Sequence, residues 1–283
     1  MSIRKIGVIG AGTMGNGIAQ VCAASALAVT LVDINDAALD RGFATISSSL
    51  DKLIKKDKLS AAERDAILGR IARTTDYAQL TGADLVIEAA TENLDLKRKI
   101  LKQIDGLLHP GAILATNTSS LSITELAACT TRADRFIGLH FFNPVPLMSL
   151  VEVITGIATS DDTRERVLAL ARAVGKAPIT VRNNAGFAVN RILCPMINEA
   201  IFALQEGVAS AEDIDTGMKL GCNHPIGPLA LADMIGLDTL LAIMEVLHKD
   251  FGDPKYRPAS RLREMVAAGR LGRKSGQGFY PYN

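Results

Sequence analysis

Short apolar runs alternate with helical patterns along the N-terminal part of the chain. The runs lie at residues 6–9, 29–32, 84–88, 112–115, 135–140, 149–154 and 178–181. Apolar positions recur at helical spacing over residues 37–56, and a shorter helix is expected over 61–71. Strands that alternate with helices predict an α/β fold, a doubly wound and mainly parallel Rossmann sheet whose later strands could run antiparallel.

The pattern changes near residue 184. No further strand is expected beyond it until the last few residues, and apolar helical patterns cover residues 187–207, 211–221, 237–251 and 258–269. The sequence therefore predicts a Rossmann domain over residues 1–184 and an all-α domain over residues 185–283. A helical unit with few aromatic residues is expected to bury excess apolar surface against a second copy, so we predict a homodimer through the C-terminal domain.

The first apolar run leads into a glycine-rich turn that reads Gly10-Ala11-Gly12-Thr13-Met14-Gly15. Gly10 permits a tight turn, Gly12 lets the backbone approach a pyrophosphate at the helix N-terminus, and Gly15 lets the helix pack on the sheet. Asp33 ends the second run, where a carboxylate can accept a hydrogen bond from a ribose 2′-hydroxyl. It would repel a 2′-phosphate, and Ile34-Asn35 supplies no cation, so the predicted cofactor is NAD and not NADP.

Composition narrows the remaining functions. The formal net charge is +1, which leaves no global field for nucleic acid or for a membrane surface. The four cysteines show neither CxxC pairing nor metal-ligand spacing, so we expect reduced thiols, a cytoplasmic protein and no metal. No secretory signal is expected before the first strand, and the most apolar long stretch, residues 185–204, carries polar and charged side chains that argue against a membrane span.

Several polar residues are expected where ligands bind in an open α/β sheet, at the carboxyl ends of the strands. Glu92 follows the run at 84–88, Asn117 and Ser119 follow the run at 112–115, and His140 ends the next run. Ser122 is expected to begin a helix that has Glu125 at its third position. Asn117 and Ser119 are then left to face a ligand.

His140 differs from the other three histidines because it is expected at the end of a buried strand. It could be simply a hydrogen-bonded core residue. The alternation over residues 150–154, however, puts Glu152 on a buried face, where a carboxylate needs a partner. A carboxylate on one imidazole nitrogen fixes the tautomer, which suits proton abstraction from an alcohol. We therefore predict that His140 and Glu152 form an acid/base pair.

Two further features allow either a structural or a functional interpretation. Four lysines gather at the end of the helix over 37–56: Lys52, Lys55, Lys56 and Lys58. Lys52 shares a helix face with Lys55 or Lys56, and the cluster could be a solvated helix end or a docking point for a phosphorylated substrate. Asn190 lies on an apolar stripe with Phe187 and Cys194, where its amide could serve helix packing or contact a substrate.

Over essentially its whole length the chain resembles the L-3-hydroxyacyl-CoA dehydrogenase family, in particular its bacterial 3-hydroxybutyryl-CoA dehydrogenases. The resemblance rests on motifs at residues 10–15, 86–90, 117–120, 140–144, 186–191, 223–228 and 271–280, which read GAGTMG, VIEAA, NTSS, HFFNP, GFAVNR, NHPIGP and LGRKSGQGFY. Two positions depart from the family pattern. Ala26 stands where the family usually has Gly at the end of the first helix, and Ala185 stands where it usually has Pro.

The resemblance implies a reversible, NAD-linked oxidation of a short (S)-3-hydroxyacyl-CoA to the 3-ketoacyl-CoA, with His140 and Glu152 as the acid/base pair. It implies that Ser119 and Asn190 contact the substrate oxygens, and it favours Lys52 and Lys55 as contacts for the CoA phosphates. It assigns further cofactor contacts to Glu92, Lys97, Asn117, Ser119, Asn143 and Lys274.

Two alternatives stay open at this point. One is another two-domain dehydrogenase of hydroxy acids that uses a catalytic lysine, and the HFFNP motif argues against it. The other is a non-catalytic NAD-binding protein that uses the fold as a structural or sensing module. Loss of the His140–Glu152 pair would have favoured the second alternative, but both residues are present.

Overall fold

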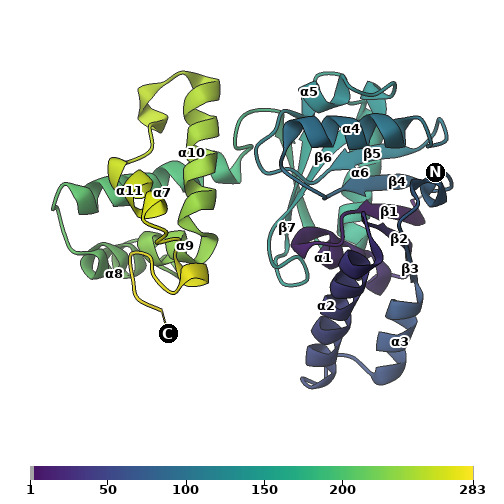
Figure 1. Cartoon of the computed structure of the whole chain (residues 1–283), viewed down its shortest axis with the longest axis horizontal. Helices are drawn as coiled ribbons and strands as arrows, with labels where there is room; N and C mark the ends of the chain where they lie inside the picture. The colour runs from purple at the N-terminus through teal and green to yellow at the C-terminus, as the bar shows by residue number, and fades with distance from the viewer. Residues whose placement is uncertain (1–2, 283) are drawn as a thin grey trace. The chain divides into compact units, whose positions relative to one another are not determined.

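The computed structural model describes residues 3–282, which form two compact units. The first unit ends at Asn183 and the second begins at Asn184. The first holds a sheet with its helices, and the second is built from helices (Figure 1).

The first unit is organised around one eight-stranded sheet in the order β3-β2-β1-β4-β5-β6-β7-β8. Its strands are β1 (Lys5–Ile9), β2 (Ala28–Val32), β3 (Ile71–Thr74), β4 (Leu85–Glu88), β5 (Ile113–Thr116), β6 (Phe136–Phe141), β7 (Leu150–Thr155) and β8 (Ala177–Arg182). Neighbouring strands are parallel except β6 and β7, so that β7 and β8 run against the rest. The predicted doubly wound, mainly parallel sheet is confirmed.

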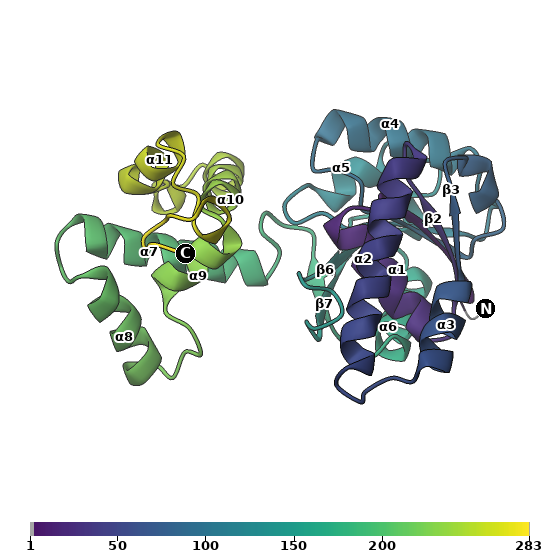
Figure 2. The ribbon, with the colours of Figure 1, turned by 60° about the horizontal axis from the view of Figure 1, so that its bottom comes forward.

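Helices cover both faces of this sheet. They are α1 (Thr13–Ala24), α2 (Asp36–Ile54), α3 (Ala61–Gly69), α4 (Leu94–Asp105), α5 (Ile123–Ala127) and α6 (Asp161–Ala173), with the 3-10 turns η1 (Tyr77–Leu80) and η2 (Ala133–Arg135). Ile18 of α1, Ile46 of α2 and Val167 of α6 are fully buried in one core with the strands. Figures 1 and 2 show α1, α2 and α6 on one side of the sheet and α4 and α5 on the other.

Side-chain caps determine where several helices begin. Asn35 accepts a hydrogen bond from the Ala38 N–H at the start of α2, and Ser60 begins α3 with a full capping box. Ser122 accepts the Glu125 N–H at 3.2 Å, as the sequence predicted. Each of these oxygens pairs with a backbone N–H that has no partner within its own helix.

The chain leaves α1 through Ala26, which lies two residues beyond the end of the helix and adopts a left-handed conformation. Ala26 has a φ of 62°, and its N–H donates to the Ala23 carbonyl while the Leu27 N–H donates to the Cys22 carbonyl. These two bonds make a Schellman motif, in which Gly usually occupies the left-handed position. The departure from the family pattern at Ala26 therefore falls where a Cβ atom is sterically unfavourable.

Strand β3 was not predicted from the sequence. We expected a helix over 61–71 and no strand before 84–88, but α3 ends at Gly69 and β3, which begins at Ile71, pairs in parallel with β2. Only Ile71 of its residues is buried, because β3 lies at the edge of the sheet. A short edge strand needs little apolar surface, so it leaves no periodic signal.

The second unit is all-α, as predicted. Its helices are α7 (Val189–Gln205), α8 (Ala211–Gly221), α9 (Pro228–Ile235), α10 (Leu237–Phe251) and α11 (Ser260–Ala267), with the 3-10 turns η3 (Pro254–Tyr256) and η4 (Arg273–Ser275). Ile197, Leu240 and Met244 are fully buried in its core. We did not expect α9, which is separated from α10 by Gly236 alone, at a φ of 100°.

Within residues 3–282, no helix combines the length and the apolar character needed to cross a membrane. Nor does this part of the chain bring three His, Cys, Asp or Glu side chains close enough together to hold a metal ion.

Candidate active site

The turn between β1 and α1 contains two glycines, Gly10 and Gly15, that a residue with a side chain could not replace. Gly10 has a φ of 96°, and a Cβ atom there would lie 2.7 Å from the Ala89 carbonyl oxygen. A Cβ atom on Gly15 would lie 1.7 Å from the Gly10 carbonyl oxygen. At Gly12 a Cβ atom would meet nothing within 4 Å, so the N-terminus of α1 is open to a ligand. The turn fits a pyrophosphate that approaches the backbone at Gly12.

Asp33 meets this turn because β1 and β2 are adjacent strands. Its carboxylate accepts hydrogen bonds from the Ala11 N–H at 2.6 Å and the Ile34 N–H at 2.7 Å. These bonds orient the carboxylate and leave lone pairs for a ribose hydroxyl. The backbone N–H of Ala11 is thus already bonded to Asp33. Of the next two residues of the turn, Thr13 lines the groove described below and Met14 packs against the core.

A groove of about 920 Å³ extends from the glycine turn along α2. Gly12 and Asp33 line one end, and the loop over residues 143–147, which includes Asn143, lines one side. The groove reaches Lys52 and Lys56 at the far end of α2. Lys55 is not among the described residues that line it, so of the two lysines that the resemblance favours, only Lys52 faces the groove.

His140 and Glu152 are brought together by the antiparallel pairing of β6 and β7. The two residues are direct partners in the strand register, and His140 Nδ1 lies 2.8 Å from Glu152 Oε2. Glu152 is fully buried and His140 is 6% exposed. The ring of Phe142 lies against the imidazole with a centroid distance of 4.6 Å. The predicted contact between the two side chains is therefore present in the structure.

Asn117 links the end of β5 to the end of β6. Its side-chain oxygen accepts the Phe141 N–H at 2.9 Å, and its own N–H donates to the Glu88 carbonyl at 2.7 Å. These bonds hold Asn117 beside the residue that follows His140.

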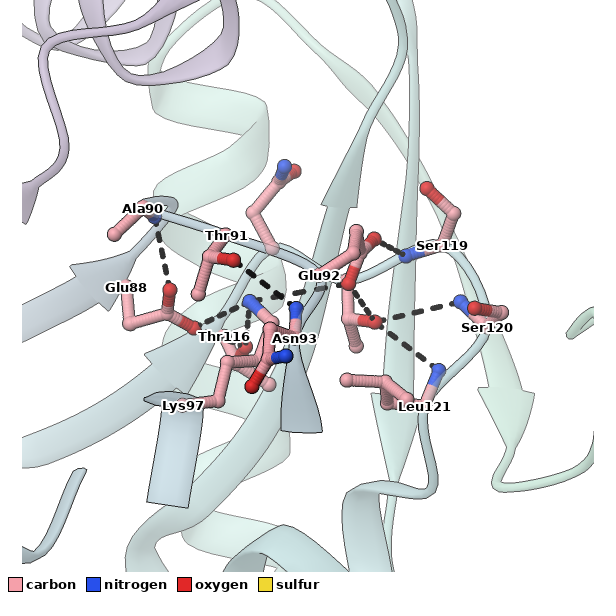
Figure 3. Close-up of polar contacts among 12 residues, drawn as sticks. Glu88, Ala90, Thr91, Glu92, Asn93, Lys97, Thr116, Ser119, Ser120 and Leu121 are labelled. Carbon is pink, nitrogen blue, oxygen red and sulfur yellow. Dashed lines mark hydrogen bonds and ion pairs between the residues drawn. The ribbon is translucent and has the colours of Figure 1, made fainter. Parts of the chain in front are cut away.

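The turn after Asn117 is anchored by Glu92. The Ser119 N–H donates to Glu92 Oε1 at 2.7 Å, and the Thr118 hydroxyl donates to Glu92 Oε2 at 2.8 Å. Figure 3 shows the carboxylate of Glu92 facing the Ser119 backbone. Ser119 is half-buried in this turn, which follows the end of β5.

Lys97 is buried more deeply than a residue that contacts a ligand at the protein surface would need to be. Its side chain has no exposed area, and its ammonium donates to Glu88 Oε2 at 2.5 Å and to the Thr116 hydroxyl at 3.3 Å (Figure 3). Glu92 is 4.0 Å from the same ammonium, and its side chain is 48% exposed. A ligand at this edge would therefore meet Glu92 before Lys97. Glu88 and Thr116 were not predicted as site residues, although a carboxylate that ends the apolar run at 84–88 was a usable signal.

Two predicted site residues belong to the second unit. Asn190 is half-buried in the first turn of α7. Lys274 lies in η4, where its ammonium donates to Asp238 at 2.7 Å. Asp238 stands in the first turn of α10, so the ion pair ties the C-terminal segment to that helix.

The first unit thus has the defining features of a dinucleotide-binding protein, with an imidazole–carboxylate pair at the end of its strands. The NAD-binding domain of 3-hydroxyacyl-CoA dehydrogenase matches residues 5–185, and the C-terminal domain of 3-hydroxyacyl-CoA dehydrogenase matches residues 186–282. The chain belongs to the 3-hydroxyacyl-CoA dehydrogenase family.

Individual relatives agree over the whole length. A probable 3-hydroxybutyryl-CoA dehydrogenase of Deinococcus radiodurans is 55% identical over 98% of this chain and 100% of its own. The 3-hydroxybutyryl-CoA dehydrogenase of Clostridioides difficile is 50% identical over 99% of each chain. The crystal structure of (S)-3-hydroxybutyryl-CoA dehydrogenase from Ralstonia eutropha matches with a TM-score of 0.98 and 66% identity over 100% of both chains. The resemblance inferred from the sequence motifs is confirmed, and so are the NAD-binding domain and the dehydrogenase class.

Proposed function

We propose that this chain catalyses the reversible, NAD-linked interconversion of (S)-3-hydroxybutyryl-CoA and acetoacetyl-CoA. The observation that carries the proposal is the buried His140–Glu152 pair, with 2.8 Å between Nδ1 and Oε2. The four-carbon acyl group is supported by the relatives named 3-hydroxybutyryl-CoA dehydrogenase.

His140 acts as the base in the oxidising direction. Its Nδ1 is occupied by Glu152, so Nε2 takes the proton of the substrate 3-hydroxyl. Glu152 holds the imidazole in that tautomer and stabilises the imidazolium that forms. Bound NAD supplies the acceptor for the hydride that leaves C3. In the reducing direction the imidazolium returns its proton to the 3-keto oxygen.

The glycine turn over residues 10–15 and Asp33 would hold the adenosine and pyrophosphate of NAD. Around the nicotinamide riboside we assign contacts to four residues of the first unit, Glu92, Asn117, Ser119 and Asn143, and to Lys274 of the second unit. A cofactor contact of Lys97 stays a prediction of the resemblance alone, because its side chain has no exposed area. Ser119 and Asn190 would orient the substrate oxygens. Orientation is important because a misplacement of about 1 Å can cost on the order of a hundredfold in rate.

For the CoA moiety we propose Lys52 as a phosphate contact, because it faces the groove along α2. Lys56 lines the same end of the groove, and we propose it as a second phosphate contact. The role of Lys55 stays a prediction of the resemblance alone. A homodimer through the second unit and a cytoplasmic location are likewise predictions.

The test is reduction of acetoacetyl-CoA followed by the loss of NADH absorbance, with NADPH in a parallel reaction. We expect turnover with NADH and much slower turnover with NADPH. Product chirality, read with an (S)-specific coupling enzyme, checks the stereochemistry. Absence of turnover by a folded protein that binds NADH would contradict the proposed function and favour a non-catalytic NAD-binding role.

A further inference from the structure

A completely buried carboxylate stands at the end of β4. Glu88 has no exposed area, and it receives hydrogen bonds from three donors. The Ala90 N–H donates to Oε1 at 2.8 Å, the Thr116 hydroxyl donates to Oε2 at 2.8 Å, and the Lys97 ammonium donates to Oε2 at 2.5 Å. A buried charge is tolerated when it is paired and hydrogen-bonded in this way.

Lys97 connects this carboxylate to a second one. It reaches from α4 to the strand ends, and Figure 3 shows its ammonium between Glu88 and Glu92. Glu88 lies at 2.5 Å and Glu92 at 4.0 Å, so Lys97 is committed to Glu88. Because Glu88 balances the buried cation, the carboxylate of Glu92 keeps its oxygens for other donors.

Those donors belong to the turn that carries Ser119. Glu92 accepts the Ser119 N–H and the Thr118 hydroxyl. The Thr118 hydroxyl in turn accepts the Leu121 N–H at 3.1 Å and the Ser120 N–H at 3.4 Å. The conformation of the whole turn therefore depends on where Glu92 points.

We propose that Glu88 is a positioning residue for the reaction. It retains Lys97 in a buried ion pair, and this leaves Glu92 to hold the turn on which Ser119 faces the ligands. Glu88 touches neither substrate nor cofactor in this role. The inference rests on the proposed function, since it assigns Ser119 a place beside the reacting groups.

Replacement of Glu88 by Gln isolates this role. Gln keeps the shape and an oxygen for the Ala90 N–H, but it removes the charge that balances Lys97. The nearest remaining carboxylate is then Glu92, at 4.0 Å. The ammonium is expected to draw Glu92 away from the Ser119 N–H, because an unbalanced buried charge is costly. Ser119 and the nicotinamide contacts would shift, while the adenosine end at Asp33 would not.

A matched control lies at the other end of α4, the helix that carries Lys97. Asp105 of α4 is also a buried carboxylate paired with a cation, since Arg132 Nε donates to it at 2.5 Å. Asp105→Asn should lower the melting temperature as Glu88→Gln does, but it has no link to the Ser119 turn.

The experiment compares Glu88→Gln with Asp105→Asn in the full chain. We expect Glu88→Gln to lower kcat for acetoacetyl-CoA by roughly ten- to a hundredfold. The Kd for NADH should rise several-fold, while the Kd for ADP, which lacks the nicotinamide riboside, should stay within about twofold of wild type. A kcat and an NADH Kd equal to those of Asp105→Asn would overturn the proposal.

A second pair of variants decides the question if Glu88→Gln does not fold. Thr116→Val removes the hydroxyl that donates to Glu88 in the buried Glu88–Lys97 pair, and Thr116→Ser keeps that hydroxyl. We expect a loss of kcat in the first that is largely recovered in the second, and wild-type kinetics in Thr116→Val would contradict the positioning role. If the wild-type protein does not reduce acetoacetyl-CoA, the proposed function fails. The ratio of the NADH and ADP dissociation constants in the same variants still tests Glu88.

Discussion

His140 on β6 and Glu152 on β7 are direct cross-strand partners, and their side chains meet at 2.8 Å in the interior of the first unit. Side chains that face each other across antiparallel strands are held close by the backbone itself. The orientation of the imidazole is therefore set before any ligand arrives, which is the condition that efficient proton transfer requires.

The first prediction concerns His140. His140→Gln should lower kcat by roughly 10²- to 10⁴-fold, because the proton acceptor is lost. The Kd for NADH, measured by fluorescence titration, should change little. His248→Gln is the control, since His248 is an exposed residue at the end of α10. A folded His140→Gln protein that keeps more than about a tenth of the wild-type rate would refute the assignment.

The second prediction concerns cofactor choice. The double variant Asp33→Ser with Ile34→Arg should shift the ratio of kcat/KM toward NADPH, because it removes a negative charge from the 2′ position and adds a cation. Ile34 is suitable because its side chain is 83% exposed next to Asp33. Ile34→Arg alone should keep the preference for NADH, since Asp33 remains. Equal use of both cofactors by the wild-type protein would show that Asp33 does not discriminate.

The third prediction separates the lysines at the end of α2. Lys52→Ala should raise KM for acetoacetyl-CoA several-fold with little change in kcat, because a contact remote from the reacting carbon acts on binding. Lys55→Ala should have a smaller effect, since Lys55 does not line the groove. An acetoacetyl-pantetheine thioester without the nucleotide should be indifferent to both changes. Equal effects of Lys52→Ala on the two thioesters would show that the lysine cluster is a solvated helix end and not a phosphate contact.

The fourth prediction concerns stability at the left-handed helix ends. Ala26→Gly should raise the free energy of unfolding by about 1 kcal/mol, because Ala is strained at a φ of 62°. Gly175 ends α6 with the same two-bond pattern at a φ of 76°, and nothing lies within 4 Å of a Cβ atom there. Gly175→Ala should therefore lower the free energy of unfolding by a similar amount. Chemical denaturation of both variants measures the two shifts, and a destabilised Ala26→Gly protein would contradict this account.

The fifth prediction concerns thiol reactivity. Burial raises the pKa of Cys22 to about 12, and burial likewise raises the pKa of Cys194 to about 12. At about pH 8 the thiolate fraction of each is on the order of 10⁻⁴, so neither should react with iodoacetamide in the folded protein. Cys222 is exposed and should be alkylated under the same conditions. Peptide mass spectrometry with and without denaturant distinguishes the sites, and early alkylation of Cys22 would show that its helix opens.

The sequence was most informative where a residue's role follows from its position on a strand. The alternation around Glu152 and the strand-end place of His140 depend only on local pattern, and the predicted contact is found. The place of Lys97 depends instead on which carboxylate the fold brings within reach. Glu88 and Lys97 lie on different elements, β4 and α4, so local pattern says nothing about their pairing.

Helical spacing alone also left the lysine cluster unresolved. Lys52 shares a face with either Lys55 or Lys56 by the three- or four-residue rule. In the structure Lys52 and Lys56, which are four residues apart, line the groove, and Lys55 is not among the described residues that line it. The edge strand β3 was missed for a comparable reason, since its pairing with β2 is a property of the sheet and not of its own residues.

The reversal of direction between β6 and β7 has an evolutionary consequence. His140 and Glu152 lie within one hairpin, the segment from Phe136 to Thr155. The geometry of the pair is therefore set within this segment and does not depend on sequence changes elsewhere in the chain. The ladder between β6 and β7, and not the connecting loop, sets the register that pairs His140 with Glu152. A slip of one residue would turn Glu152 to the opposite face of the sheet. The contact between His140 and Glu152 is thus preserved wherever the pairing of these two strands is preserved.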